Sequence, residues 1–379
     1  MSLEFMITTI EGFEDVAAQE IKDVGGRSIE VKTARVFFRG EANLMYRVNI
    51  RSRCVHRLML VLGRGQALGL NDIYRFAKSI NYFEVMKLDQ SFAVRTTRVG
   101  EHDYTSIDAS AMVGQAIVDS FKEVKGVRPR VDLKNPDVEV DVYVKDSEVV
   151  IGVNTTGESL HKRNYRVYDH PAALKTTLAA CMLRFSGWKG EGLLDPMCGG
   201  GTIVIEAALM ARRFPPGFFR KSMAFTKLPL YDPKVHREEV EKALEEANRD
   251  HFEIYGFDIS PKHIKGALSN ASSAGVDDTI QFAVRDCTRK ETYSDLSTKF
   301  VIVNPPYGIR HGRPKAIKDL YTNFLKAISQ NLSGTILTAI VGCPKIFETA
   351  LESVNLKVLD SRSVKHGNLP ARVYKIRVS

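Results

Sequence analysis

Hydrophobic and polar positions in the first 155 residues alternate between a strand period and a helix period. Apolar residues recur at every second position in short runs, and at helical spacing in the stretches between them. Strands that alternate with helices in this way predict α+β sandwiches. The expected strands cover residues 5–9, 35–39, 57–63, 91–98, 138–144 and 148–154, and the expected helices cover residues 14–24, 41–50, 71–81 and 106–122.

The second half of the chain has a different pattern. Four short apolar runs each end in a polar residue, and helical patterns separate the runs. This arrangement predicts an open α/β sheet whose ligand binds at the carboxyl ends of the strands. A helix is expected over residues 172–188, with Pro171 at its favourable first position. The polar residues that end the runs are Asp195, Asp258, Asp286 and Asn304.

Composition and charge narrow the class of protein. The apolar share of 44% and the charged share of 26% are ordinary for a globular chain. No apolar run approaches the ~18 residues of a membrane span, and no secretory signal is visible at the start. The five cysteines form no CxxC pair, so we expect no metal site and a reducing cytoplasm. The net charge of +9 favours a polyanionic partner such as nucleic acid.

A glycine-rich run, DPMCGGGT at residues 195–202, is the sharpest feature of the second half. It follows an expected strand and precedes an expected helix. Consecutive glycines allow a ligand to approach the backbone, and the helix start offers free N–H groups. The run matches neither GxGxxG nor the GK[ST] ending of a P-loop, which disfavours a dinucleotide and a triphosphate.

Two acidic residues end the strands that come next in the chain. At the end of its strand, the Asp258 carboxylate can accept both hydroxyls of a ribose, and Asp286 can accept an adenine amine. Either residue alone is more typical of a helix cap or a turn. Together with Asp195, three carboxylates at successive strand ends favour a nucleoside site.

The fourth strand leads into Asn304, Pro305, Pro306 and Tyr307. The two prolines fix the backbone and remove two donors, so the loop is rich in acceptors. The side-chain oxygen of Asn304 and the carbonyl of Pro305 can accept both N–H bonds of an exocyclic amine. Tyr307 can stack on a flat base. This loop therefore predicts chemistry at an amine nitrogen.

The 195–202 and 304–307 runs resemble motifs I and IV of class I S-adenosylmethionine (SAM)-dependent methyltransferases that modify exocyclic amines. Residues before about 165, ending in GESLHKR at 157–163, resemble the paired ferredoxin-like and THUMP domains of tRNA-modifying enzymes. The combination resembles the archaeal and bacterial tRNA guanine-N2 methyltransferases that make N2-methylguanosine at position 6 of the acceptor stem. The resemblance implies a ferredoxin-like domain (1–60), a THUMP domain (61–155), a linker (156–169) and a Rossmann-like α/β methyltransferase domain (170–379).

The resemblance also implies partners and a role for each matching residue. The partner would be the acceptor stem and 3′ end of tRNA, bound by a monomer, with the target base flipped out of its stem. Asn304, Pro305, Pro306 and Tyr307 would hold and stack the substrate base. The cofactor would be bound by His170, Pro171, Ala172, Asp195, Cys198, Gly199, Gly200, Gly201, Thr202, Asp258, Ile259, Asp286, Cys287 and Asn304.

One departure from a simple nucleotide-binding unit is the spacing of 63 positions between Asp195 and Asp258. Residues 211–252 must therefore form an insertion. Its basic and aromatic part, residues 214–221, could touch RNA or could cover the sheet edge. A charged helix over residues 238–250 is expected to be a solvated face.

The charge is unevenly distributed. Residues 1–165 contain 23 Lys and Arg against 23 Asp and Glu, whereas residues 166–379 contain 31 against 22. We therefore expect a major phosphate-binding surface in the second part, and a basic face in an otherwise neutral first part. The expected phosphate ligands are Arg212, Arg213, Arg220, Lys221, Arg310, Arg313, Lys315 and Lys318. The expected basic face comprises Arg35, Arg39, Arg47, Arg51, Arg53, Arg57 and Arg64.

Several other functions remain open at this point. The substrate could be a guanosine elsewhere in tRNA or in ribosomal RNA. Relatives that act at the junction position of tRNA tend to carry Asp in place of Asn304. An adenine-N6 methyltransferase and a DNA-modifying enzyme of restriction type are chemically possible. A non-catalytic RNA-binding protein is the alternative outside the enzymes, although the complete set of acids argues against it.

Overall fold

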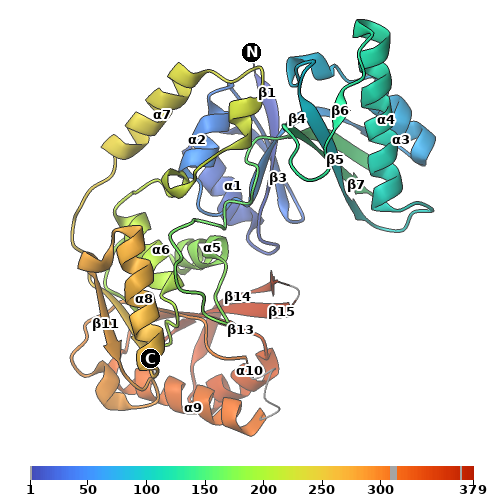
Figure 1. The fold of residues 1–379 in the computed structure, drawn as a ribbon. Helices are drawn as coiled ribbons and strands as arrows, with labels where there is room; N and C mark the ends of the chain where they lie inside the picture. The colour runs from blue at the N-terminus through green and yellow to red at the C-terminus, as the bar shows by residue number, and fades with distance from the viewer. Residues whose placement is uncertain (1, 308–313, 368) are drawn as a thin grey trace.

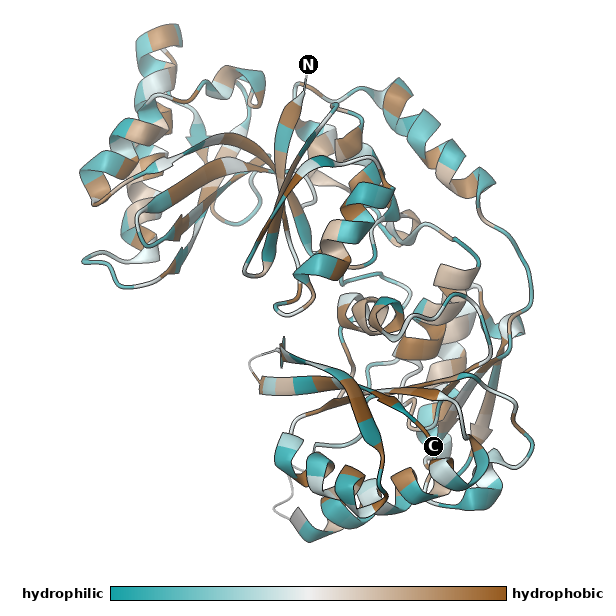
Figure 2. Ribbon diagram, turned by 180° about the vertical axis from the view of Figure 1, so that it is seen from behind, coloured by the Kyte–Doolittle hydropathy of each residue, from teal (hydrophilic) through white to brown (hydrophobic). Residues whose placement is uncertain are grey.

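The computed structural model describes residues 2–307, 314–367 and 369–379, and it places two sheets in two parts of the chain (Figure 1). We call residues 2–155 the N-terminal module and residues 170–379 the C-terminal domain. In both parts the strands inside the sheets are mostly hydrophobic (Figure 2). Arg310 and Arg313, two of the expected phosphate ligands, lie outside the described residues.

The N-terminal module is an eight-stranded sheet in the order β2-β3-β1-β4-β8-β7-β5-β6. Four helices bury their apolar residues against one face of this sheet. The strands are β1 (Leu3–Thr8), β2 (Arg27–Lys32), β3 (Arg35–Gly40), β4 (Arg57–Gln66), β5 (Ser91–Val99), β6 (Arg130–Val131), β7 (Val138–Lys145) and β8 (Glu148–Asn154). The helices are α1 (Glu14–Asp23), α2 (Leu44–Arg51), α3 (Leu70–Lys78) and α4 (Ser106–Lys125).

Strand β4 joins the two halves of the module. Its residue Leu60 pairs with Phe5 of β1 on one side and with Val153 of β8 on the other. The sheet is therefore continuous across residue 60, where the sequence places the boundary between two domains. The face away from the helices carries its own small apolar cluster, which includes Met59 and Tyr143.

The C-terminal domain is a seven-stranded sheet in the order β11-β10-β9-β12-β13-β15-β14. β15 runs antiparallel to its two neighbours, and the other strands are parallel. Helices α5, α6 and α8 pack on one face, and α9 and α10 pack on the other. The expected open α/β sheet is confirmed.

The strands of the C-terminal domain are β9 (Leu193–Asp195), β10 (Ile254–Asp258), β11 (Ile280–Val284), β12 (Phe300–Val303), β13 (Ile336–Val341), β14 (Lys357–His366) and β15 (Leu369–Arg377). The helices are α5 (Thr176–Ser186), α6 (Thr202–Ala211), α7 (Pro233–Glu245), α8 (Pro261–Ala274), α9 (Pro314–Asn331) and α10 (Pro344–Ser353).

The prediction of a helix that starts at Pro171 is wrong. α5 begins only at Thr176, and residues 170–175 form an irregular turn. Hydrogen bonds to groups outside a helix hold this turn. The amide of Ala172 donates to Nδ1 of His170 at 3.2 Å, and the carbonyl of Leu174 accepts from Arg166 at 3.0 Å. The first bond folds the backbone back onto the His170 side chain, and the second engages a carbonyl that would accept from residue 178 in a helix.

The insertion packs on the N-terminal module, and its contact with RNA stays a prediction. α7 lies beside α2 in Figure 1. Arg47 of α2 donates to both carboxylate oxygens of Glu239 on α7, at 2.9 and 2.6 Å. The backbone of Gly217 lies so close to α2 that a Cβ there would stand 2.7 Å from the carbonyl oxygen of Asn49. Since Glu239 is buried, the expectation of a merely solvated helix is also wrong.

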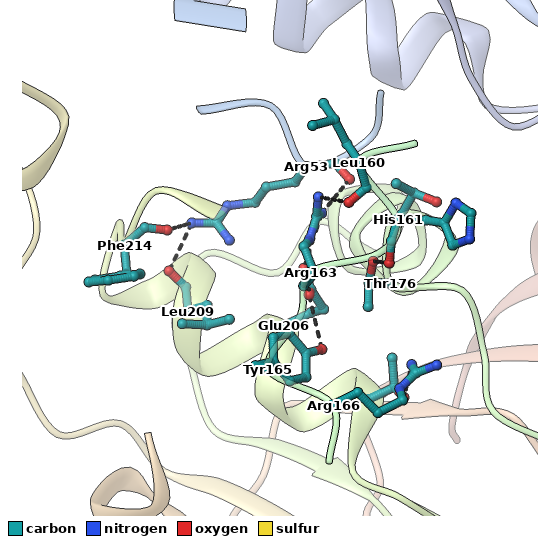
Figure 3. Close-up of polar contacts among 12 residues, drawn as sticks. Arg53, Leu160, His161, Arg163, Tyr165, Arg166, Thr176, Glu206, Leu209 and Phe214 are labelled. Carbon is teal, nitrogen blue, oxygen red and sulfur yellow. Dashed lines mark hydrogen bonds and ion pairs between the residues drawn. The ribbon is translucent and has the colours of Figure 1, made fainter. Parts of the chain in front are cut away.

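The expected basic face of the module is present only in part, because acidic and carbonyl oxygens engage Arg47, Arg51, Arg53 and Arg64. Arg51 pairs with Glu246 of the insertion at 2.6 Å, and Arg64 pairs with three glutamates. The buried Arg53 donates to the carbonyls of Leu209 and Phe214 in the C-terminal domain (Figure 3). These arginines thus stabilise the protein internally instead of presenting free charge.

The linker is fixed by a buried polar network between the two parts (Figure 3). Arg163 donates to the carbonyl of Arg53 at 2.8 Å and pairs with Glu206 of α6 at 3.4 Å. The hydroxyl of Tyr165 donates to the same carboxylate at 3.1 Å. Because all these groups are buried and hydrogen-bonded, removing one partner would leave a costly unpaired charge.

Candidate active site

The carboxyl ends of β10, β9 and β12 lie side by side. Asp195 at the end of β9 is in register with Gly256 of β10, so Asp258 extends just beyond it. Asn304 follows the end of β12, which pairs with β9 on its other side. Asp286 follows β11, which pairs with β10. The fold thus brings the four predicted polar residues to one edge of the sheet.

The glycine loop is a tight cradle between β9 and α6. Gly199 and Gly201 have φ values of +53° and +80°, which favour glycine. A Cβ at Gly199 would stand 3.3 Å from the His170 ring. Asp258 supports the loop, because its Oδ2 accepts the N–H of Gly199 at 3.0 Å while its Oδ1 accepts the N–H of Ser260 at 2.9 Å. Cys198 is small buried filler beneath the loop, packed near Ile264, Ala267 and Phe282.

Residues 166–174, which we call the strap, cross over this loop. Arg166 donates to the hydroxyl of Thr202 at 3.0 Å and to the carbonyl of Leu174 at 3.0 Å. The His170 ring contacts the His263 ring, with centroids 4.3 Å apart. His170 thus lies against Gly199 and Gly200, in a turn and not at the start of a helix. The predicted closure of His170, Pro171 and Ala172 over a cofactor stays a prediction.

Asn270 on α8 also contacts the strap, and the sequence analysis did not single it out. Its carboxamide lies between the strap and Gly200, and the side chain is 1% exposed. One signal was present in the sequence. Asn270 falls on the apolar face of α8, alongside Ile264, Ala267 and Ala271. A polar residue on a buried face needs partners, but the sequence does not show which ones.

Asn304 is oriented by the strap. Its Nδ2 donates to the carbonyl of Ala172 at 3.4 Å. Its Oδ1 is buried and has no hydrogen-bond donor among the described residues. Since the N–H end is engaged by a carbonyl, the oxygen is the end left to accept from a substrate. The neighbouring Pro305 is buried, and the carbonyl of the exposed Pro306 accepts from Tyr321 at 2.8 Å.

The Tyr307 ring lies against the backbone of Gly342, where a Cβ would stand 2.5 Å from the ring. Burial raises the pKa of its hydroxyl above the ordinary value, so the phenol is neutral. Stacking of this ring on a base stays a prediction.

Burial and hydrogen bonds set the charges at the sheet edge. Burial raises the pKa of the Asp195 carboxyl well above its usual value. Hydrogen bonds from the hydroxyl and amide of Thr288 lower the pKa of Asp286 and keep it ionised. Burial and the neighbouring His263 lower the pKa of His170. The site therefore presents a neutral imidazole over the loop and an ionised acid beyond β11.

Two predicted cofactor residues differ in exposure. Cys287 is buried, its carbonyl accepts from Tyr293 at 2.7 Å, and burial raises the pKa of its thiol to about 12. Ile259, by contrast, is 69% exposed directly after Asp258. An isolated apolar side chain beside a carboxylate that could hold a ribose is suited to contact a base. Both assignments stay predictions.

The expected phosphate ligands of the C-terminal domain fall into two groups. Arg212 is buried and makes two bonds of 2.8 Å with Asp278, and Arg220 donates to carbonyls that include Glu158. The prediction that these two bind phosphate is wrong, because their donors stabilise the fold. The residues of the expected set that are exposed are Arg213, Lys221, Lys315 and Lys318.

The described part of the chain contains neither a group of metal ligands nor a helix that could span a membrane. Within residues 2–307, 314–367 and 369–379, no three His, Cys, Asp or Glu side chains are grouped so that they could hold a metal ion. Across the same residues, no helix is both long and apolar enough to span a membrane.

Comparison with known proteins identifies three domain types. Residues 163–372 match the RMKL-like methyltransferase domain, residues 69–154 match the THUMP domain, and residues 4–59 match the RlmL ferredoxin-like domain. The fold and the sheet edge therefore define a THUMP-containing methyltransferase. The chain belongs to the RMKL-like methyltransferase family, which confirms the resemblance seen in the sequence.

Individual relatives agree with this assignment. The tRNA (guanine(6)-N2)-methyltransferase of Methanocaldococcus jannaschii is 37% identical over 98% of this chain and 99% of its own. The protein of the same name from Archaeoglobus fulgidus is 41% identical over 98% and 91%. Ribosomal RNA large subunit methyltransferase K/L of Shewanella frigidimarina is 32% identical over 84% of this chain but only 45% of its own. Among solved structures, a possible methylase from Clostridium difficile covers 100% of this chain and 99% of its own, at 27% identity and a TM-score of 0.89.

Proposed function

We propose that this enzyme methylates the exocyclic N2 amine of a guanosine in tRNA, at position 6 of the acceptor stem, with SAM as the methyl donor. The observation that carries the proposal is the buried Oδ1 of Asn304 at the sheet edge, which accepts no hydrogen bond from the residues that the structure describes. The two archaeal relatives that match almost the whole chain support the choice of guanosine and of tRNA.

We assign SAM to the cradle, where consecutive glycines let a ligand approach the backbone. A Cβ at Gly199, Gly200 or Gly201 would crowd His170 or Ala267 and disturb the loop. We assign the ribose to Asp258, the adenine to Asp286 and the methionine part to the loop that starts at Asp195. When bound, SAM supplies a methyl group that is already activated by its sulfonium. The protein therefore has little acid–base chemistry to perform, and its main task is alignment.

Asn304 and Pro305 would perform that alignment on the substrate side. Their oxygens accept the two N–H bonds of the amine, which turns the nitrogen lone pair out of the plane of the base. As the new N–C bond forms, the bond from the methyl carbon to sulfur would break and leave a neutral thioether. Positive charge would develop on the nitrogen, and the same two acceptors would stabilise it. The nitrogen would then lose one proton, to water or through Asn304 and Pro305.

The helix-free face of the N-terminal sheet offers a place for the RNA end. A pocket of about 230 Å³ there is lined by residues of both halves of the module, among them Arg35, Arg57 and Asp141. The guanidinium of Arg35 lies 3.4 Å from the centroid of the Tyr143 ring. Burial raises the pKa of Asp141 to about 7, so this acid can accept or donate toward a base. We assign the 3′ end of the tRNA to this pocket.

Ribosomal RNA is the second candidate substrate. The K/L relative covers most of this chain, and this chain covers less than half of that protein. The same site could therefore accept a guanosine in ribosomal RNA, whose chemistry is that of a tRNA guanosine but whose surrounding structure differs.

The test is methylation of bulk tRNA and of ribosomal RNA with SAM labelled in its methyl group, followed by nuclease mapping. We expect label in tRNA at guanosine 6, and none when that guanosine is replaced by inosine, which lacks the N2 amine. Label at another guanosine would overturn the position. Label in ribosomal RNA alone would favour the second candidate. Chromatography at several protein concentrations and fractionation of cells test the proposed monomer and cytoplasmic location.

A further inference from the structure

Asn270 is a single buried side chain that joins the strap to the cofactor loop. Its Oδ1 accepts the amides of Val167 and Tyr168, both at 2.8 Å. Its Nδ2 donates to the carbonyls of Tyr168 and Gly200, at 3.0 and 2.9 Å. Because two donors surround the oxygen and two acceptors surround the nitrogen, only one orientation of the carboxamide is possible.

These four bonds connect three segments that are distant in sequence. Asn270 belongs to α8, Gly200 belongs to the loop after β9, and Val167 and Tyr168 belong to the strap. Within the strap, His170 faces Gly199. The distance between the loop and the strap at this point therefore depends on one carboxamide.

We propose that Asn270 is a positioning residue that locks the strap against Gly200 and so sets the affinity of the loop for its cofactor. This inference rests on the proposed use of SAM. Because Asn270 is 1% exposed and its carboxamide contacts the backbone of the strap and of Gly200, it would act through Gly200 and His170.

Replacing Asn270 by Asp tests this role with almost no change in shape. The carboxylate can still accept from Val167 and Tyr168, but it cannot donate to either carbonyl. Instead, it places an oxygen within hydrogen-bond distance of the Gly200 and Tyr168 carbonyls, which repel it. Buried acceptors that are left without a donor destabilise this arrangement. The strap moves away from the loop to relieve this repulsion, and the cradle widens.

The variant is expected to fold, because the strap is anchored on both sides of Asn270's contacts. Upstream, Arg163 and Tyr165 bind Glu206 (Figure 3). Downstream, the hydroxyl of Thr176 donates to the carbonyl of His161 at 2.7 Å. Neither anchor involves α8.

Asn154 of the N-terminal module provides a closely matched control. It is also 1% exposed, its Oδ1 accepts two backbone amides, and its Nδ2 donates to the carbonyl of Gly157 and to Glu139. Asn154→Asp therefore makes the same chemical change in an equally buried carboxamide, remote from the cofactor loop. It should lower stability without changing the affinity for SAM.

The experiment measures the dissociation constant of SAM by calorimetry, the KM for tRNA and the melting temperature of the full-length protein. For Asn270→Asp we expect SAM to bind roughly tenfold more weakly or worse, while the KM for tRNA changes less than about twofold. An unchanged dissociation constant, or an equal loss in Asn154→Asp, would overturn the role, since a purely structural effect would be shared by both variants. If the wild-type protein does not bind SAM, the proposed function fails instead.

A second variant keeps the test open if Asn270→Asp does not fold. Arg166→Met removes the strap's other tie to the loop, at Thr202, and leaves α8 unchanged. We expect a weaker affinity for SAM in this variant too. Unchanged binding by Arg166→Met would contradict the dependence of the loop on the strap.

Discussion

Asn304 shows what the structure adds to a motif at the scale of single residues. The sequence places an acceptor-rich loop after a strand, but it does not fix which end of the carboxamide faces the substrate. The structure does so through one bond, from Nδ2 to the carbonyl of Ala172. That carbonyl is free to accept because the strap is a turn at this point and not a helix.

A first prediction concerns this carboxamide. Asn304→Ala should lower the methylation rate by about 10²–10³ because one of the two acceptors on the amine is lost. Affinity for SAM should stay within about twofold, since Asn304 contributes little to the cradle. Single-turnover methylation and calorimetry measure the two effects. Asn331→Ala, at the exposed end of α9, is the control, and retained activity in Asn304→Ala would refute the assigned role.

The site residues that the sequence predicts lie at strand ends, whereas those that it does not predict are bonded to segments far away in the chain. Asp195, Asp258 and Asn304 stand at strand ends, and strand ends follow from local hydrophobic patterns. Asn270 and Arg166 bind backbone or hydroxyl groups of segments far away in the chain. No local pattern encodes such a partner, so these two could be found only once the fold was known.

At the scale of elements, the insertion is the feature that the sequence described least well. Its charged helix α7 has the composition of a solvated face, yet Glu239 is buried beneath Arg47. A buried charge is stable only when it is paired, and its partner comes from a helix about 190 residues away. The sequence pattern of α7 alone therefore does not distinguish a helix that packs on α2 from a fully solvated helix.

We predict that Glu239→Ala weakens the docking of α7 on α2. The free energy of unfolding should fall by about 1–3 kcal/mol, because Arg47 remains partly buried without its carboxylate. Denaturant unfolding measures the loss, and Glu241→Ala on the exposed face of α7 should cost little. A double-mutant cycle with Arg47→Ala must show coupling; additive losses would contradict the pair.

Other element errors have equally local reasons. The sequence analysis does not predict the edge strand β2, whose apolar alternation is limited to Ile29 and Val31 and none of whose residues is buried. The sequence predicts a start for α5 that is too early, because apolar residues of the strap extend the helical pattern toward the N-terminus. Strands with a buried face, such as β4 and β7, were predicted to within a few residues.

At the scale of the whole molecule, charge is separated between the two parts. Residues 1–165 have no net charge, and residues 166–379 contain 31 basic against 22 acidic residues. Ion pairs account for most of the arginines that looked free in the module. Exposed cations of the C-terminal domain, such as Lys315 and Lys318 at the start of α9, are the better candidates for phosphate contacts.

These two lysines give a prediction about salt dependence. Lys315→Gln with Lys318→Gln should weaken tRNA binding, and the slope of log affinity against log salt should fall by about 2, because each lysine releases about one counterion. Filter binding at several salt concentrations measures the slope. Lys234→Gln with Lys242→Gln removes the same charge from exposed positions of α7 and should leave the slope unchanged. A slope that both pairs change equally would count against a phosphate site on α9.

Stability should depend on pH through two histidines between the module and the C-terminal domain. His56 bonds the Thr177 hydroxyl at 2.9 Å, and its ring lies 6.0 Å from that of His161. Burial lowers the pKa of His56 to about 3 and that of His161 to about 4, from an ordinary 6.5. Below pH 6.5 these two histidines bind protons in the unfolded chain but not in the folded protein. Stability should therefore fall as the pH falls from 6.5 toward 4.

Melting temperatures at about pH 7.5 and about pH 5 test this expectation. The wild-type protein should melt lower at the acidic pH, and His56→Gln should reduce the difference. The exposed His251 supplies the control variant His251→Gln. An acid shift of the same size in all three proteins would exclude the buried pair as its source.

Strand β4 has a consequence for how such proteins are assembled over evolutionary time. Because its residues pair with β1 and with β8, a crossover near residue 60 would divide one strand between two genes. Each product would then carry an unpaired sheet edge, which promotes aggregation. We therefore expect the ferredoxin-like and THUMP segments to be inherited together, with tolerated exchange points after β8 and not between the two.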